Sequence, residues 1–321
     1  MKDLSQIAEI IEAEINNISY LKDPENLYSP IEYTMELGGK RIRPILLLIS
    51  YQLFNDNFER AFSPAKAIEL FHNFTLLHDD IMDKAPLRRG KITVHKKWNN
   101  NIAILSGDVM MIHAYQLLAQ VESKYLKSIL NIFNKAAIEV CEGQQWDMDF
   151  ESKDDVPLID YMQMIEFKTA VLLAASLKIG AVLADAKKKD QNHLYEFGLN
   201  MGIAFQLKDD LLDVFGTSKL FGKKIGGDII ANKKTFLYLK ALQISDFSTK
   251  LKLKKLYTSE NENDTKVEKV KKIFVDLNIK KHTLDLMKSY YIKAMKHLDA
   301  IDSDKKSPLI DFADKLMHRD R

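Results

Sequence analysis

The segment from Leu194 to Phe215, LYEFGLNMGIAFQLKDDLLDVF, decides the fold class of this chain. Its apolar side chains recur every three or four residues, which is the period of one face of an α-helix. A single lysine interrupts this stripe, which consists of Leu194, Phe197, Met201, Ala204, Lys208, Leu211 and Phe215. A second stripe with the same period contains Ile68, Phe71, Phe74, Leu77 and Ile81. No segment alternates as a β-strand does, so the sequence predicts an all-helical protein without a sheet.

Composition and charge narrow the class of protein further. The 321 residues carry a net charge of only +2, so the clustered basic excess of a nucleic-acid surface is not expected. The single cysteine, Cys141, excludes an internal disulfide and favours a reducing compartment. The most apolar stretch, residues 169–184, is short for a membrane span and contains Lys178. We therefore expect a cytoplasmic protein with no transmembrane segment.

The chain shows no shift in composition that would mark a domain boundary, and we expect a single domain over residues 1–321. Two Ser-Pro pairs, Ser29-Pro30 and Ser63-Pro64, predict helix starts, because serine caps a helix and proline fits its first turn. Residues 84–92 and 216–232 read as loops, because they gather glycine and basic residues just after acidic helical segments.

Two DDxxD clusters are the most informative polar feature. The first consists of Asp79, Asp80 and Asp83, and the second of Asp209, Asp210 and Asp213. On a helix the first and last aspartates of each cluster share one face. A single cluster of this kind could be a solvated acidic helix face, but a second copy on another helix makes that reading less plausible. Carboxylates in this arrangement suit Mg²⁺, which combines a few of them with substrate phosphates and waters.

Polar residues on the acidic faces extend this pattern. His72 lies two turns before Asp79, and Gln206 lies one turn before Asp210. Either side chain could equally be a hydrogen-bonded core residue. Basic residues follow both clusters: Arg88 and Arg89 after the first, and Lys223, Lys224 and Lys233 after the second. They could form surface salt bridges, or they could hold an anionic ligand opposite the metal ions.

A third basic loop, GGKRIRP at residues 38–44, precedes a strongly apolar helix. Its glycines let the backbone approach a ligand closely, and Lys40 and Arg43 supply positive charge. The spacing does not match the Walker A pattern of a nucleotide P-loop. Together with the acidic clusters, this loop indicates a second diphosphate site.

Several spaced motifs in this order resemble one known family. They are GGKRIRP, HNFTLLHDDIMDKAPLRRG, EGQQWD, FKTAVLL, and FQLKDDLLDVFG followed by GKKIGGDIIANKKT. The chain resembles the trans-type polyprenyl diphosphate synthases, a family that includes farnesyl and geranylgeranyl diphosphate synthases. The resemblance implies a single large helical bundle of the isoprenoid synthase type with a central cavity, usually a homodimer. It also implies Mg²⁺-dependent condensation of isopentenyl diphosphate with allylic diphosphates, with three Mg²⁺ ions when substrate is bound.

The resemblance also assigns roles to residues of this sequence. All six aspartates of the two clusters are implied metal ligands: Asp79, Asp80, Asp83, Asp209, Asp210 and Asp213. The implied isopentenyl diphosphate site consists of Gly39, Lys40, Arg43, His72 and Arg89. The implied allylic diphosphate site consists of Arg88, Gln144, Lys168, Lys223, Asp228 and Lys233. Lys168, Thr169, Gln206 and Arg88 are the implied catalytic residues. Asn232 departs from the pattern, since many family members have glycine there, and we expect no consequence of this difference.

The residues before the first cluster predict product length. Phe74 would lie about 7–8 Å and Phe71 about 12 Å along the helix from Asp79, so either ring could form a floor for the growing chain. Either phenylalanine could also be an ordinary core residue. In the family, an aromatic residue five before the first aspartate resembles short-chain synthases; Phe74 holds this position and the small Thr75 follows it. The motif also lacks the two-residue insertion of typical bacterial farnesyl synthases. These features favour a C20 product, with C15 second.

Two other functions fit parts of the sequence. A terpene cyclase would share the helices and one DDxxD cluster, but it would normally carry a mixed Asn/Ser/Glu motif in place of the second. A non-catalytic regulatory subunit would be expected to have lost aspartates or basic residues, and this chain keeps both sets. A prenyl diphosphate synthase is therefore the favoured function.

Overall fold

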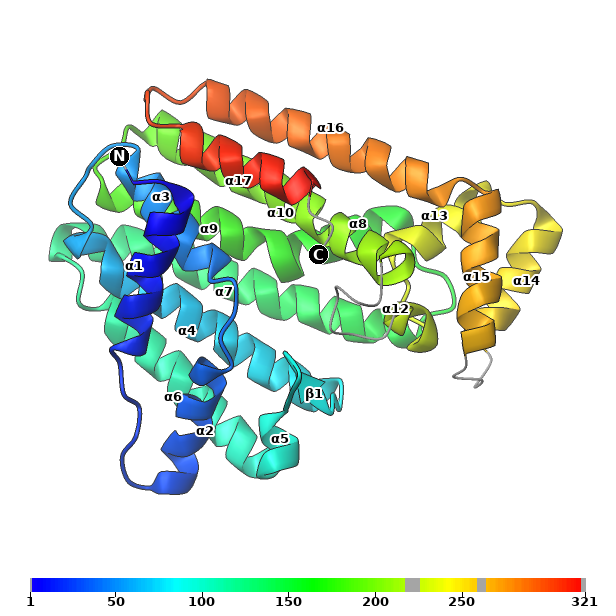
Figure 1. Ribbon diagram of the computed structural model, residues 1–321, viewed down its shortest axis with the longest axis horizontal. Coiled ribbons are helices and arrows are strands. Elements are labelled where there is room, and N and C mark those ends of the chain that lie inside the picture. The colour runs from blue at the N-terminus through cyan, green and yellow to red at the C-terminus, as the bar shows by residue number, and fades with distance from the viewer. Residues whose placement is uncertain (1, 217–225, 259–263, 319–321) are drawn as a thin grey trace. The chain divides into compact units, whose positions relative to one another are not determined.

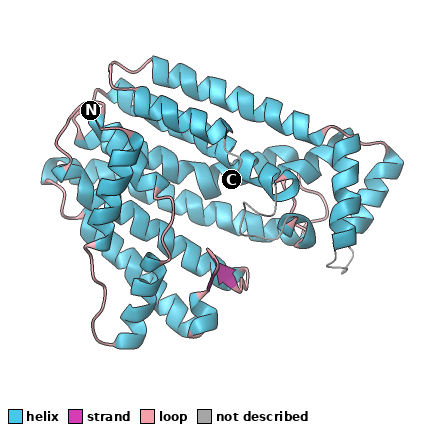
Figure 2. Cartoon of the chain, viewed as in Figure 1, coloured by secondary structure: helices cyan, strands magenta, loops and turns pink. Residues whose placement is uncertain are grey.

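A computed structural model describes residues 2–216, 226–258 and 264–318. The chain divides into two compact units. The first comprises residues 1–134, 175–194 and 301–309, and the second comprises residues 135–174, 195–300 and 310–321. Helices account for most of the described residues (Figures 1 and 2). The predicted all-helical class is thereby confirmed, whereas the single domain over residues 1–321 stays a prediction.

The first unit is built around α4, which packs mainly against α6 and α3. Its core is made of fully buried aliphatic and aromatic side chains such as Leu47, Ile68 and Phe71. The elements that lie in it are α1 (Leu4–Asn16), α2 (Glu25–Glu36), α3 (Ile42–Gln52), α4 (Glu59–Met82), β1 (Leu87–Arg88), β2 (Lys91–Ile92), α5 (Val94–Lys97) and α6 (Asn100–Leu118).

The second unit has its own buried cluster, which includes Phe150, Leu207, Phe236 and Phe274. Three helices belong to the second unit over most of their length: α7 (Ser123–Ser152), α10 (Lys188–Phe215) and α17 (Ser307–His318). The segment α9 (Val171–Leu183) contributes its first four residues. The remaining elements are α8 (Leu158–Ile165), η1 (Glu166–Ala170), α12 (Gly227–Ile230), α13 (Phe236–Ile244), α14 (Phe247–Tyr257), α15 (Asp264–Asp276) and α16 (Ile279–Asp299).

Two local predictions were wrong. The Ser-Pro pairs do not open helices, because α2 begins at Glu25 and α4 at Glu59. Each of these glutamates lies in a first turn, where the helix dipole favours negative charge. Each proline then lies in the second turn, where it removes one hydrogen bond and leaves the rest of the helix intact. The second error concerns the two predicted loops. Residues 84–92 contain a small antiparallel hairpin of β1 and β2. Within residues 216–232, of which 217–225 lie outside the described residues, the chain forms the short helix α12.

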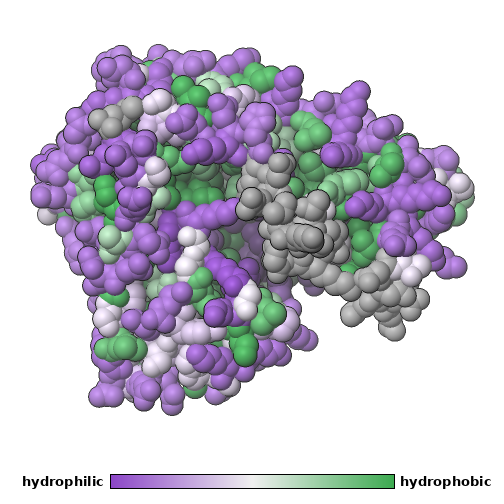
Figure 3. Space-filling model, in the orientation of Figure 1, coloured by the Kyte–Doolittle hydropathy of each residue, from purple (hydrophilic) through white to green (hydrophobic). Residues whose placement is uncertain are grey.

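The surface is mainly hydrophilic on the face drawn in Figure 3, with smaller groups of hydrophobic side chains between the polar ones. Among the residues that the structure describes, no helix combines the length and the apolar character needed to cross a membrane.

Candidate active site

The first aspartate cluster lies at the end of α4, in the first unit. Arg88 holds it there: its Nη2 donates to Asp80 Oδ1 at 2.6 Å and to Asp79 Oδ2 at 3.1 Å. Asp80 is buried, and burial raises its pKa, while the hydrogen bonds from Arg88 oppose the shift. Asp83 is the exposed residue that ends the helix. The predicted grouping of Arg88 with this cluster is therefore present.

The β1–β2 hairpin sets the direction of both arginines that follow the cluster. Arg88 pairs with Lys91 across the two strands, so Arg89 and Gly90 form the two-residue turn. Both turn residues have positive φ, 53° and 75°, as the tight turns that suit a twisted hairpin require. Glycine adopts this conformation readily, and Arg89 is forced into it. The RRG sequence thus sends two neighbouring guanidinium groups to different partners.

The GGKRIRP loop meets Arg89 in the same unit. Gly39 has φ of 144°, and a Cβ atom there would lie 2.8 Å from Nη2 of Arg89. Any larger residue would therefore displace that guanidinium group. A few residues further on, Arg43 Nη1 lies 3.0 Å from Nε2 of His72. The structure thus brings together Gly39, Arg43, His72 and Arg89, the group that the family resemblance implied. Lys40 is exposed on the same loop.

The electrostatics of this basic cluster indicate an anion site. Burial lowers the pKa of Arg43 to about 10, an effect that Glu69 opposes and Arg89 increases. Burial also holds the pKa of His72 well below its usual value, with Arg43 and Arg89 adding to the shift. Nε of Arg43 is buried without a hydrogen-bond partner among the described residues. Cations that destabilise one another in this way would be stabilised by a bound diphosphate.

Arg41, the residue between the two predicted phosphate ligands of the loop, has a structural role. It adopts φ of 47° and is buried. Its guanidinium donates to Glu69 Oε1 at 2.9 Å, to Glu12 Oε2 at 3.0 Å and to the Met35 carbonyl at 3.0 Å. The loop is thus fastened to α1, α2 and α4 by one side chain.

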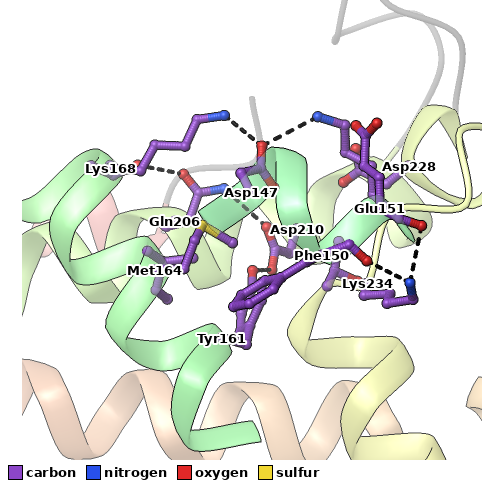
Figure 4. A pocket seen from close by; sticks show the side chains of 14 residues that line it. Asp147, Phe150, Glu151, Tyr161, Met164, Lys168, Gln206, Asp210, Asp228 and Lys234 are labelled. Carbon is purple, nitrogen blue, oxygen red and sulfur yellow. Dashed lines mark hydrogen bonds and ion pairs between the residues drawn. The ribbon is translucent and has the colours of Figure 1, made fainter. Parts of the chain in front are cut away.

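The second unit contains a cavity of about 130 Å³. Residues from α7, α8, η1, α10, α12 and the segment before α13 line it, and Figure 4 shows their side chains. The lining residues are Asp147, Phe150, Glu151, Tyr161, Met164, Ile165, Lys168, Thr169, Gln206, Asp210, Asp228, Lys233, Lys234 and Thr235.

Asp147 brings two predicted phosphate-binding lysines together at this cavity. Lys168 Nζ lies 2.6 Å and Lys233 Nζ 3.5 Å from the same atom, Asp147 Oδ2. The Asp147 carboxyl is mostly buried, and its pKa is nevertheless low, because the two ammonium groups outweigh the cost of burial. Figure 4 shows Asp147 between the two amine groups. One carboxylate thus holds both lysines on one side of the cavity.

A chain of hydrogen bonds connects Thr169 to the second aspartate cluster. Thr169 Oγ1 donates to Gln206 Oε1 at 3.0 Å, and Gln206 Nε2 donates to Asp210 Oδ1 at 3.0 Å. The hydroxyl of Tyr161 donates to the other oxygen of Asp210. Burial raises the pKa of Asp210 to about 7, and Asp228 adds to the shift, while these two donors oppose it. Asp210 is therefore a carboxyl whose ionisation is costly in this cavity.

Lys168 and Thr169 lie on the π-helical turn η1, between α8 and α9. Such turns are rare and often occur at functional sites. Two helical glycines make room for it. A Cβ on Gly143 of α7 would overlap the backbone of Lys168, and one on Gly202 of α10 would lie 2.5 Å from Cα of Ala170. The wide turn therefore fits only because both neighbouring helices have no side chain there.

The segment that carries Asp228 and Lys233 is anchored to the end of α10. The amide of Gly226 donates to the Asp213 carbonyl at 2.8 Å, and the amide of Asp228 donates to Asp213 Oδ2 at 3.1 Å. The amide of Lys233 in turn donates to the Asp228 carbonyl at 2.8 Å. The last aspartate of the second cluster thus positions a second acidic residue, Asp228.

The remaining predicted residues are placed less centrally. Gln144, Asp209 and Asp213 are outside the lining of the cavity, although all three are partly exposed. Lys223 and Lys224 lie outside the described residues. Asn232 adopts φ of 57°, a backbone conformation that favours glycine, and asparagine tolerates it better than most residues do.

The sequence did not single out three residues that line this cavity. Tyr161 reads as part of an apolar helix face, and only the fold reveals its bond to Asp210. Phe150 covers the same cavity from α7. Lys234 donates to the backbone carbonyls of Phe150, Glu151 and Lys153 at the end of α7, so it caps that helix. The sequence shows that Lys234 stands next to Lys233, but it does not show that the two lysines have different roles.

The phenylalanines before the first cluster differ in their surroundings. Phe71 is fully buried against Phe133, with ring centroids 5.0 Å apart. Phe74 is partly exposed; its ring centroid lies 5.5 Å from that of Phe71 and 4.7 Å from that of His78. Thr75 Oγ1 donates to the His72 carbonyl. Phe71 is thus a core residue, whereas Phe74 is accessible.

The donor sets of both clusters fit Mg²⁺ only as partial ligand sets. Among the described residues, no three Asp, Glu, His or Cys side chains converge to form a complete metal site. Mg²⁺ combines a few carboxylates with phosphate oxygens and waters, so the aspartates of a cluster could supply part of its ligand set. Three of these carboxylates would be stabilised by a nearby cation. Asp79 and Asp80 already pair with Arg88, and the pKa of Asp210 is raised.

Comparison with known proteins identifies the family. Residues 24–274 match the family model described as Polyprenyl synthetase. A geranylgeranyl diphosphate synthase of Sulfolobus acidocaldarius is 39% identical over 306 residues, covering 92% of this chain and 91% of that protein. A geranylfarnesyl diphosphate synthase of Natronomonas pharaonis is 36% identical over 256 residues, covering 74% and 75% of the two chains. A crystal structure of a geranylgeranyl pyrophosphate synthase has a TM-score of 0.95, 43% identity and 99% coverage of both chains.

The chain therefore belongs to the polyprenyl synthetase family. The resemblance seen in its motifs is confirmed, as is the expectation of an enzyme of the prenyl diphosphate synthase class. Synthases of this family generally depend on Mg²⁺.

Proposed function

We propose that the protein condenses isopentenyl diphosphate with dimethylallyl, geranyl and farnesyl diphosphates, and that its main product is geranylgeranyl diphosphate (C20). The observation that carries this proposal is the presence of two different polar sites. One is a cluster of arginines and a histidine on the GGKRIRP loop and α4. The other is a lysine-lined cavity that contains Asp210. The reaction joins two diphosphate esters, and only the allylic one releases its diphosphate group. It therefore needs one site that holds a diphosphate throughout and another that stabilises a departing diphosphate.

The basic cluster of the first unit would hold isopentenyl diphosphate, whose diphosphate does not leave. Three observations support this role: Arg43 contacts His72, Arg89 lowers the pKa of both, and Lys40 lies on the same loop as Arg43. Guanidinium groups match phosphate oxygens with paired hydrogen bonds. The low pKa of His72 means a neutral ring that can still donate one hydrogen bond.

The cavity of the second unit would hold the allylic diphosphate through Lys168 and Lys233. Bound Mg²⁺, in three ions, would neutralise the charge that develops on the departing diphosphate. The two lysines add to that stabilisation, which weakens the C–O bond and favours an allylic cation. Oγ1 of Thr169 and Oε1 of Gln206 are polar groups that can stabilise the cation. The buried setting excludes water that would otherwise trap it.

The carbon–carbon bond then forms between the double bond of isopentenyl diphosphate and the allylic cation. The resulting cation loses a proton, and the released diphosphate accepts it, which restores a double bond. Positioning of the two substrates is the main contribution of the protein to this step.

Phe74 supports the C20 product. It is the accessible ring of the Phe71–Phe74 pair, one turn before Asp79, and Phe71 and Phe133 pack behind it. A relative that is similar at 36% identity is named a geranylfarnesyl diphosphate synthase, so products of C25 occur in close sequence neighbours. A C15 product is the second possibility.

We also propose a homodimer formed through α6. This helix exposes a row of large apolar side chains: Ile104, Leu105, Ile112 and Tyr115. A dimer would remove this surface from water. Leu105→Glu with Ile112→Glu should convert the dimer to a monomer in analytical ultracentrifugation. A wild-type monomer at micromolar concentration would refute the proposal. The cytoplasmic location stays a prediction.

The activity is tested with purified protein, Mg²⁺, isopentenyl diphosphate and each allylic diphosphate of five, ten or fifteen carbons. Products are dephosphorylated and sized by chromatography. A C20 alcohol supports the proposal, and Asp79→Ala should abolish it, whereas Asp304→Ala, at an exposed position of the same unit, should not. Cyclised hydrocarbon from one allylic substrate would indicate a terpene cyclase. No product from any primer would indicate a regulatory subunit.

A further inference from the structure

The segment from Gly226 to Lys233, which carries two of the proposed allylic diphosphate residues, is held at both ends by α15. At its end, Nζ of Lys266 donates to Oδ1 of Asn232 at 2.6 Å. At its start, Val267 occupies the space beside Gly226, where a Cβ atom would lie 2.5 Å from Cγ1 of Val267. Two consecutive residues of one helix thus fix both ends of this segment.

The hydrogen bond between Lys266 and Asn232 joins a buried ammonium group to a residue with positive φ. Lys266 is only 3% exposed, so its ammonium group needs hydrogen-bond acceptors within the protein. Asn232 has φ of 57°, which costs an ordinary residue conformational energy. The side-chain amide oxygen offsets this cost, because it accepts the hydrogen bond from Lys266. Glycine, which many family members have at this position, would adopt the same backbone with less strain but would offer no acceptor for Lys266. We therefore give up the expectation that the departure at Asn232 has no consequence.

The position of Asn232 connects this contact to the cavity. Asn232 directly precedes Lys233, whose ammonium group reaches Asp147, and the Lys233 amide donates to the Asp228 carbonyl. If this turn were less restrained, the side chains of Asp228 and Lys233 could move relative to Asp147 and Asp210. Displacements of about 1 Å at a reacting site can cost on the order of a hundredfold in rate.

We propose that Lys266, acting through Asn232, is a positioning residue for the allylic diphosphate site. It fixes the turn that aims Asp228 and Lys233 at the cavity. This inference rests on the proposed function, and it adds a residue from α15, a helix that contributes nothing to the cavity lining.

The test compares Lys266→Met with wild type in steady-state kinetics, where methionine keeps the length of the side chain but removes its charge. We expect the KM for the allylic diphosphate to rise about five- to twentyfold, with the KM for isopentenyl diphosphate within about twofold of wild type. Lys272→Met, at an exposed position of the same helix, is the matched control and should change neither value. Lys266→Arg, which keeps the charge, should restore part of the affinity.

Asn232→Gly separates positioning from general stability, because it keeps the backbone conformation and removes only the acceptor. It should raise the allylic KM about three- to tenfold, and adding Lys266→Met to it should have a much smaller effect than in wild type. If Lys266→Met does not fold, Asn232→Gly carries the test alone. An unchanged allylic KM in either variant, equal rises of both KM values, or fully additive effects would overturn the inference. An inactive wild type would instead refute the proposed function.

Discussion

Gly143 of α7 lies against the backbone of Lys168 so closely that a methyl group on it would overlap the Lys168 amide nitrogen. The π-helical turn that carries Lys168 and Thr169 thus depends on a missing side chain on another helix. Gly143→Ala should shift this turn and lower kcat by about tenfold or more, because Lys168 and Thr169 would leave their positions. Steady-state kinetics with saturating substrates would measure this.

Gly180→Ala is the matched control for that change. A Cβ on Gly180 would overlap the carbonyl oxygen of Leu47. Both of these residues belong to the first unit, whereas Lys168 belongs to the second. Gly180→Ala and Gly143→Ala should both lower Tm. At temperatures below thermal unfolding, however, Gly180→Ala should leave kcat near the wild-type value. Equal losses of kcat in both variants would contradict a specific role for Gly143.

Asp210 should make the protein less stable as pH rises. Its folded-state pKa is raised to about 7 from a usual 3.8, so the folded protein binds this proton more tightly than the unfolded chain. The stability that the protonated form contributes is therefore present below about pH 4 and lost as pH rises to about 7. Asp210→Asn should raise the free energy of unfolding, and with it Tm, more at pH 8 than at pH 5, by up to about 4 kcal/mol at pH 8. The same change should abolish activity.

Thermal unfolding with EDTA present would measure this effect, since metal ions would otherwise stabilise the carboxylate. Asp160→Asn, at an exposed position on α8, provides the control and should give the same small shift at both pH values. A gain for Asp210→Asn that does not depend on pH would show that Asp210 is ionised at little cost.

Phe74 and Phe71 should respond differently to truncation. Phe74→Ala should lengthen the product beyond C20, because it removes the accessible ring one turn before Asp79. Phe71→Ala removes a fully buried ring and should cost about 3–5 kcal/mol of stability with little change in product. Chromatography of dephosphorylated products, together with chemical unfolding, would separate the two effects. An unchanged product from Phe74→Ala would remove it as the floor.

The buried ion pair between Arg41 and Glu69 should be costly to break. Arg41→Met leaves Glu69 buried without its cation, which should cost about 3–5 kcal/mol and raise the KM for isopentenyl diphosphate, since the GGKRIRP loop loses its anchor. Arg60→Met removes an exposed pair with Glu122 and should cost less than about 1 kcal/mol. Urea unfolding and KM measurements would check both. If Arg41→Met and Arg60→Met lowered the free energy of unfolding by similar amounts, burial would not explain the cost of breaking the Arg41–Glu69 pair.

Long helices and the main polar groupings could be predicted from the sequence, because each is encoded locally. The stripe from Leu194 to Phe215 became α10, and the spacing of His72 and Asp79 placed them on one helix face. The contact of His72 with Arg43 needed the fold, and before that only the family resemblance placed the two residues in one site.

The features that could not be predicted depend on contacts between distant segments or on very short elements. The strands of the hairpin have two residues each, too few for an alternating pattern. The π-helical turn is set by Gly143 and Gly202 on other helices, and no local pattern announces it. Tyr161 meets Asp210 across 49 positions of sequence, and by its spacing it reads as an ordinary core residue.

The adjacent lysines at the end of the Gly226–Lys233 segment have opposite tasks: Lys233 faces Asp147, and Lys234 caps α7. A sequence alignment that slips by one position across this pair would still match lysine with lysine and score well. It would nevertheless transfer the substrate role that we propose for Lys233 to Lys234, whose hydrogen bonds among the described residues go to backbone carbonyls. A relative that keeps a single lysine here must therefore be aligned by its structure before anyone can say which of the two tasks it has lost.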